Sequence, residues 1–157
     1  MQTPAQLFRT LAQVPVLGAP FFAKAVTLVA PYFATISPRF LVLEPGRAEV
    51  AMKNRRAVHN HIGTVHAIAV CNLCELAAGT MIESTLPREL RWIPRGMTVR
   101  YLKKADTDLI ARTQMETPTA GFVGDIVIAV RVHNTRDEVV MEADITMYVS
   151  LRDNGRS

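Results

Sequence analysis

Hydrophobic and polar residues alternate along four segments in the second half of this chain. A repeat of two residues is typical of β-strands that bury one face. Polar turns at 104–108, 117–121 and 134–137 separate these segments, as in a meander of antiparallel strands. The predicted strands are 97–102, 109–115, 125–132 and 139–149, and two shorter ones, 40–43 and 48–52, flank a turn at 44–47.

A different pattern runs from Gly63 to about residue 84, where apolar residues occur on every side of a helical projection. The stretch contains no proline and ends before Pro87. A helix without a polar face must be covered on all sides. A curled antiparallel sheet is the economical cover, so the sequence predicts an α+β fold in which the sheet wraps one long central helix.

The N-terminal part predicts two short amphipathic helices, at 4–13 and 20–33. Prolines and a lysine interrupt the apolar stretch 14–36, which leaves no run of the ~20 apolar residues that a membrane-spanning helix needs. We therefore expect no integral membrane segment. Residues 1–37 are assigned to an N-terminal helical extension and residues 38–157 to the sheet-and-helix domain, within a single domain overall.

Composition limits the class of protein and its partners. With 49% hydrophobic residues in 157, the chain is expected to fold. The two cysteines, Cys71 and Cys74, lie inside the apolar helix, which favours core residues of a protein in a reducing cytoplasm. The net charge of +4 is spread along the chain without alternating aromatic residues. This pattern suits a phosphate-bearing small ligand, and we expect no nucleic-acid partner.

The main candidate for chemistry is the polar loop 59–66, which leads into the apolar helix, together with Glu75 in the middle of that helix. A carboxylate among apolar side chains is costly to bury without a partner. The helix start offers backbone N–H groups without intrahelical partners and the positive end of the helix dipole. An acid combined with a place for a developing oxyanion predicts hydrolysis of an acyl compound.

The spacing in this region resembles a known motif. The chain reads Asn60-x-x-Gly63-x-x-His66-Ala67, with Glu75 nine positions after the histidine. This is similar to Asn-x-x-Gly-x-x-His-Gly-Gly, followed by Asp or Glu nine residues past the histidine, in hotdog thioesterases of the phenylacetyl-CoA and hydroxybenzoyl-CoA type. Segment 101–105 resembles that family's strand ending in an aromatic residue, Leu, Arg, Pro and Ala. The resemblance covers residues 38–151 and extends to a functionally uncharacterised branch with extra N-terminal helices.

The resemblance implies a hotdog fold, hydrolysis of an acyl-CoA thioester and a role for each motif residue. Glu75 corresponds to the catalytic acid, either as base on water or as nucleophile, and the backbone N–H of Ala67 to the group that holds the thioester oxygen. Asn60 matches the position that orients water or the carbonyl, Gly63 permits the tight turn, and His66 orients the loop. No cofactor is implied beyond the coenzyme A moiety of the substrate.

Two positions depart from the family. Ala67 stands where the family has glycine, and its methyl group narrows the acyl entrance. Gly79 stands where a serine or threonine often holds the water, and Thr80 is rotated from it by about 100°. A non-catalytic hotdog protein that binds acyl-CoA or lipid is therefore the alternative to a thioesterase. Glu75 then has a structural role, as a buried acid bonded across a dimer.

His66 and Glu75 are nine residues apart, which places them on opposite sides of one helix and about 13 Å apart along its axis. They cannot easily meet at one site in a single chain. Two antiparallel central helices in a two-fold dimer would bring Glu75 of one subunit near the helix start of the other. We therefore expect a homodimer, or a dimer of dimers, with shared active sites, as the resemblance also implies.

Two further sets of residues are candidates for ligand binding. Lys103 and Lys104, at the end of a strand, are candidates for the 3′-phosphate and diphosphate of coenzyme A, and a solvated strand end is the equal alternative. The three histidines of loop 59–66 raise the question of a metal. No two histidines are spaced i, i+4 on the helix, so we expect no metal site.

Overall fold

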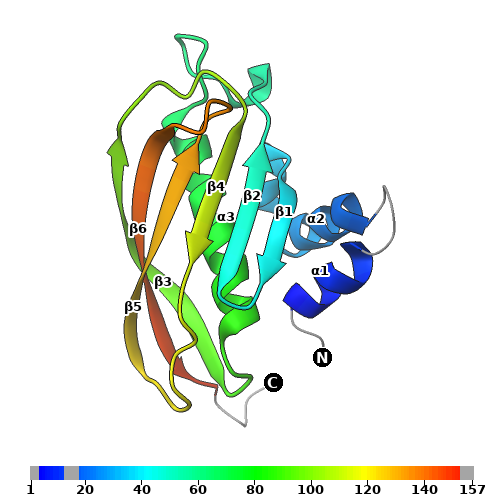
Figure 1. Ribbon diagram of the computed structural model, residues 1–157, viewed down its shortest axis with the longest axis vertical. Helices are drawn as coiled ribbons and strands as arrows, with labels where there is room; N and C mark the ends of the chain where they lie inside the picture. The colour runs from blue at the N-terminus through cyan, green and yellow to red at the C-terminus, as the bar shows by residue number, and fades with distance from the viewer. Residues whose placement is uncertain (1–3, 13–17, 153–157) are drawn as a thin grey trace.

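Six strands form one antiparallel sheet that curls around a long helix (Figure 1). The computed structural model describes residues 4–12 and 18–152. Neighbouring strands follow the order β1-β2-β4-β5-β6-β3, so β1 and β3 are the two edges. The predicted α+β fold is confirmed. Its strands are β1 (Arg39–Glu44), β2 (Arg47–Met52), β3 (Leu90–Tyr101), β4 (Leu109–Gln114), β5 (Gly124–His133) and β6 (Val139–Leu151).

The long helix α3 (Ala67–Thr85) contacts all six strands. Among the described helices it is the one that is long and apolar enough to cross a membrane, but 61% of its apolar window is buried inside the protein, as in a core helix. The apolar pattern predicted that the helix begins at Gly63, but it begins at Ala67. The difference arises because hydrogen bonds within the preceding loop hold residues 60–66 in a turn.

The sheet does not enclose α3 on every side, in contrast to the expectation from its apolar composition. Spacings of three, four and eight residues place a partly exposed stripe on one face of the helix. The stripe consists of Ile68, Cys71, Glu75 and Glu83. This face of α3 is therefore open to a ligand or to another chain.

The N-terminal helices pack beside β1 and reach α3 (Figure 1). They are α1 (Pro4–Ala12), α2 (Gly18–Val29) and the 3₁₀ helix η1 (Pro31–Ile36). The ring of Phe22 lies 5.3 Å from that of Phe8 and 5.0 Å from that of Phe40, both edge-to-face. These contacts place the helices and the sheet in one hydrophobic core.

The predicted helices 4–13 and 20–33 are found with different limits. The first is α1, and residue 13 lies outside the described residues. The second starts two residues earlier, at Gly18, and gives way to η1 at Pro31. Proline has no N–H to continue the α-helical bonding pattern and its ring clashes with the preceding turn, so α2 ends just before it.

Strand β3 is the largest difference from the predicted strands, because it begins at Leu90 and not at residue 97. It pairs with β6 along its whole length, with a bulge between Pro94 and Gly96. Its first part, residues 90–96, has mostly exposed side chains, so it has no buried face and no hydrophobic alternation. A proline is tolerated there because an edge strand leaves part of its backbone unpaired.

Phe22 is expected to tie the N-terminal helices to the sheet. Replacing it in Phe22→Ala removes a ring that is 1% exposed and should lower the free energy of unfolding by about 3–5 kcal/mol. The neighbouring Phe21 is 61% exposed, so Phe21→Ala should change stability by less than about 0.5 kcal/mol. Urea unfolding followed by circular dichroism measures both. Equal losses in the two variants would contradict a shared core.

Candidate active site

Asn60 holds together the loop that precedes α3. Its Oδ1 accepts hydrogen bonds from the backbone N–H groups of Ile62 and Thr64, each at 3.1 Å, and its Nδ2 donates to Thr64 Oγ1 at 2.8 Å. Its own backbone N–H donates to the carbonyl of Thr64 at 2.9 Å. One of the two Nδ2–H groups has no partner among the described residues, so it is available to a ligand.

Gly63 is needed in this loop for its backbone conformation. Its φ is +80°, in the left-handed region that residues with a side chain rarely adopt. A Cβ at this position would meet nothing within 4 Å, so space is not the constraint. Its N–H donates to the carbonyl of Asn60 at 3.2 Å, which closes the turn.

His66 caps the start of α3. Its Nδ1 accepts a hydrogen bond from the N–H of Ile68 at 3.1 Å, which requires that nitrogen to carry no proton. The backbone N–H of His66 donates to the carbonyl of Val58 at 2.7 Å. The backbone N–H of Val65 donates to the carbonyl of Ala105 at 2.9 Å. The helix start is thereby held between two neighbouring segments.

Ala67 is the first residue of α3, and its backbone N–H has no hydrogen-bond partner among the described residues. The next N–H, of Ile68, is bonded to the His66 ring, and that of Val70 to the His66 carbonyl. An unpaired N–H at the positive end of a helix can donate a hydrogen bond to a ligand oxygen that carries negative charge.

Glu75 lies eight residues into the helix, about 12 Å along the axis from Ala67. Its half-buried carboxylate has no hydrogen bond or ion pair with any described residue. The structure therefore brings Asn60, Gly63, His66 and Ala67 together at the helix start and leaves Glu75 apart within one chain. As the sequence predicted, one chain does not join the acid to the loop.

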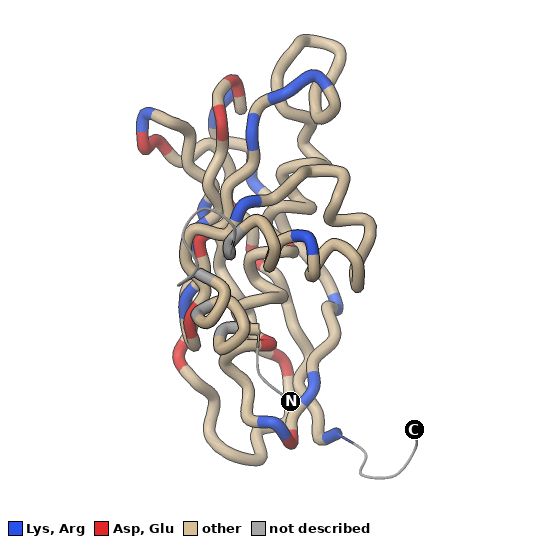
Figure 2. Tube along the Cα trace, turned by 90° about the vertical axis from the view of Figure 1, so that its right-hand side faces the viewer, with Lys and Arg blue, Asp and Glu red and all other residues tan. Residues whose placement is uncertain are grey.

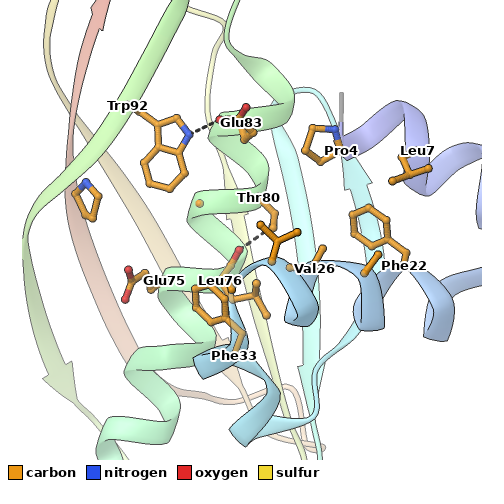
Figure 3. A pocket seen from close by; sticks show the side chains of 15 residues that line it. Pro4, Leu7, Phe22, Val26, Phe33, Glu75, Leu76, Thr80, Glu83 and Trp92 are labelled. Atoms are coloured by element: carbon orange, nitrogen blue, oxygen red, sulfur yellow. Dashed lines mark hydrogen bonds between the residues drawn. The ribbon is translucent and has the colours of Figure 1, made fainter. Parts of the chain in front are cut away.

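Glu75 lines a groove of about 560 Å³ that follows the open face of α3. In Figure 3, β3 forms one wall with Trp92, while α2 and α1 form the other with Val26, Phe22 and Leu7. Apolar side chains dominate the lining. It comprises Pro4, Leu7, Phe22, Ala25, Val26, Val29, Ala30, Phe33, Glu75, Leu76, Gly79, Thr80, Glu83, Trp92 and Pro94.

Gly79 stands where the resemblance predicted a serine or threonine, and the structure shows what a glycine permits there. A Cβ at this position would lie 3.0 Å from the Trp92 ring, tighter than ordinary contacts, so the indole packs directly on the helix backbone. The Trp92 Nε1–H donates to Glu83 Oε2 at 2.7 Å. The Thr80 hydroxyl donates to the carbonyl of Leu76 at 2.7 Å. No hydroxyl is thus free one turn beyond Glu75.

Glu83 and Trp92 line the groove, yet the sequence did not single out Glu83. The signal was available, because 75, 79 and 83 recur every four residues on one helix face. The partner of Glu83 is 9 residues away in sequence, on β3, and only the packing of that edge strand brings the two together.

The two lysines proposed for coenzyme A differ in their surroundings. Lys103 Nζ lies 2.6 Å from Glu138 Oε1, so its charge is already paired. Hydrogen bonds from Lys103, Asn134 and Arg136 lower the pKa of Glu138 to about 2. Lys104 is exposed and has no ion pair among the described residues. Figure 2 shows basic and acidic residues interspersed along the chain.

Of the two cysteines of α3, Cys74 is a core residue, as expected, and Cys71 lies on the open stripe. Cys74 is buried and Cys71 half-buried, and neither forms a disulfide. Burial raises the pKa of both thiols, which disfavours the reactive thiolate. Among the described residues, no group of three His, Cys, Asp or Glu side chains is placed to hold a metal ion.

A curled antiparallel sheet around one helix is the hotdog fold, and the structural neighbours of this chain are hotdog-fold proteins of the thioesterase class. The chain belongs to the family described as Domain of unknown function (DUF4442), whose model matches residues 18–149. The match includes α2, so helices before the sheet are part of the family pattern. No curated protein matches this chain.

Three solved structures illustrate the similarity. A structural-genomics crystal structure without a functional name is 46% identical, covers 95% of this chain and 99% of its own, and has a TM-score of 0.84. A Pseudomonas aeruginosa protein called a "probable thioesterase" is 20% identical over 88% and 97% of the chains, with a TM-score of 0.75. A hypothetical thioesterase from Streptococcus pneumoniae with coenzyme A is 19% identical over 74% and 88%, with a TM-score of 0.63.

The His66 cap can be tested by substitution. His66→Ala removes the acceptor for the Ile68 N–H and should lower the free energy of unfolding by about 1 kcal/mol. His66→Asn keeps an N-cap acceptor and should recover most of the loss. Urea unfolding of the three proteins gives the comparison. If asparagine destabilises as much as alanine, the ring contributes through packing and not through the cap.

Proposed function

We propose that this protein hydrolyses acyl-CoA thioesters. The observation that carries the proposal is the Glu75 carboxylate, which has no partner among the described residues and lines an apolar groove. A carboxylate is rarely left so unless it acts on a ligand or a water. The unpaired N–H of Ala67 supplies the second requirement, a donor for the oxygen of the reacting carbonyl.

The chemistry follows from these two groups. As general base, Glu75 takes a proton from water while the water oxygen attacks the thioester carbonyl carbon. Charge develops on the carbonyl oxygen, which accepts from the N–H of Ala67, and the C–S bond breaks to release the coenzyme A thiolate. As nucleophile, Glu75 instead forms an anhydride that water hydrolyses. The second side-chain Nδ2–H of Asn60, which has no partner among the described residues, is suited to orient the water or the carbonyl.

A second copy of the chain is needed to complete this site. Glu75 and Ala67 of one chain are about 12 Å apart along α3, too far for one carbonyl group to contact both. Two exposed apolar side chains support a dimer. Ile68 on the open stripe is 55% exposed, and Ile93 on the β3 edge is 60% exposed. Long edge strands with exposed apolar residues are prone to pair. Two-fold symmetry then gives two equal sites.

Coenzyme A binding is proposed by analogy with the Streptococcus pneumoniae hypothetical thioesterase, whose structure contains coenzyme A. Lys104, which has no paired carboxylate among the described residues, is the better candidate of the two lysines for a phosphate group. Lys103 would first have to leave Glu138.

The catalytic role of Glu75 can be tested by comparing its substitution with that of an acid outside the groove. Glu75→Gln preserves shape but removes the base or nucleophile, and should lower turnover of acyl-CoA about 10²–10⁴-fold. Glu89→Gln is the control, because that carboxylate is exposed and does not line the groove. It should keep turnover within a fewfold of wild type. Release of free thiol from a panel of acyl-CoAs measures both.

Two outcomes would contradict the proposal. Equal background turnover in wild type and Glu75→Gln would exclude hydrolysis at this site. Binding of acyl-CoA without turnover by the wild-type protein would favour the non-catalytic alternative, in which the missing hydroxyl at Gly79 has cost the protein its activity. Light scattering on each variant verifies that its oligomeric state is unchanged.

Sharing of sites between subunits can be tested by mixing two inactive proteins. Ala67→Pro removes the proposed donor N–H at the first helical position, where proline is tolerated, and His66 already has the extended conformation that a following proline requires. Alone it should lower turnover about 10²–10³-fold. A mixed dimer with Glu75→Gln regains one intact site, so unfolding and refolding an equimolar mixture should restore about a quarter of wild-type turnover. No recovery would place both groups in one chain.

A further inference from the structure

The groove beside Glu75 has the shape of a channel along one helix face. Residues 75, 76, 79, 80 and 83 of α3 form its floor, which is the spacing of a single face over more than two turns. Glu75 marks one end and Glu83 the other, about 12 Å apart along the helix axis. Between them the walls come from different parts of the chain, β3 on one side and α1, α2 and η1 on the other (Figure 3).

The lining offers almost no polar contact between the two carboxylates. The Thr80 hydroxyl is bonded to the carbonyl of Leu76, and Glu83 accepts from Trp92. Leu76, Val26 and Phe33 supply hydrocarbon surface along the channel. A ligand that fills it must therefore be apolar along its length and can carry a reactive polar group only at the Glu75 end.

At the other end of this stretch, Glu83 is bonded to Trp92 and Arg152. The Trp92 ring forms the β3 wall over Gly79, where a Cβ would be only 3.0 Å away, and its N–H is bonded to Glu83. Arg152 donates to Glu83 Oε1 at 3.3 Å and to the carbonyl of Leu90 at 2.8 Å. These contacts hold Glu83 in place, about 12 Å along the helix axis from Glu75.

We propose that the groove binds an unbranched acyl chain of about eight to ten carbons, with its thioester at Glu75 and its methyl end beside Glu83. Carbon–carbon bonds of about 1.5 Å in a zigzag advance about 1.25 Å each, so a depth of about 12 Å holds about ten carbons. The volume of about 560 Å³ lies in the usual range of small-molecule sites. The placement of the thioester rests on the proposed hydrolase function.

The N-terminal helices acquire a role in this arrangement. Leu7 of α1 and Phe22 and Val26 of α2 form the wall opposite β3, and the hotdog core alone would leave the groove open there. These helices therefore determine which acyl chains bind. Val26 faces the groove, whereas Leu28 on the same helix is 74% exposed and does not line it.

The experiment measures binding without turnover. Saturated acyl-CoAs from two to sixteen carbons are titrated into the Glu75→Gln protein by calorimetry. The dissociation constant should fall about two- to fourfold per methylene group up to about ten carbons and then stay constant. Val26→Trp in this background should weaken binding of the eight- and ten-carbon chains at least tenfold while leaving acetyl-CoA unchanged. Leu28→Trp, the matched control, should reproduce the parent profile.

A second variant tests the Glu83 end. Trp92→Leu removes the indole that holds Glu83 and should move the plateau to chains at least two carbons longer, a gain that misfolding cannot imitate. An affinity independent of chain length, or identical profiles for Val26→Trp and Leu28→Trp, would overturn the inference. Turnover of all acyl-CoAs by the wild-type protein with no chain-length preference would overturn the inference about the channel and leave the thioesterase assignment intact. Chain-length-dependent binding without wild-type turnover would support the channel and refute the hydrolase.

Discussion

The burial of α3 by the curled sheet is the interaction on which the rest of the structure depends. The helix contacts all six strands, and residues such as Leu73, Ala77 and Met81 are fully enclosed. A helix so apolar has no stable place in water, and a sheet so curved needs a filling. Each element therefore supplies what the other lacks, and the loop before the helix is held in place by the same packing.

The cover is incomplete on one side, and this incompleteness creates the candidate site. The sheet ends at the β3 edge, so the stripe of α3 that carries Glu75 remains open. The N-terminal helices close part of the gap through the cluster of Phe8, Phe22 and Phe40, and what remains is the groove. A carboxylate is tolerated on the core helix because it lies on this stripe, half-buried and in reach of ligand and water.

Gly79 illustrates how a change that looks like a loss can have a structural cause. The sequence alone indicates a missing hydroxyl. In the structure, the absence of a side chain admits the Trp92 ring against the helix, and the ring in turn bonds Glu83. The indole forms one wall of the groove as a result. Because position 79 offers no hydroxyl, the attacking water of a hydrolytic site here would have to be bound by Glu75 and Asn60.

The sequence by itself determined the fold class, five of the six strands with nearly correct limits, the two short N-terminal helices and the grouping of Asn60, Gly63 and His66 at a helix start. These features depend on local periodicity, on turn residues and on motif spacing, all of which are readable along the chain. Only the tertiary structure decided the start of β3, the pairing of Lys103 with Glu138, and the groove with Trp92 in its wall. The first part of β3 has no buried face to impose a pattern, and contacts between distant segments leave no local signal, because they exist only once the chain has packed.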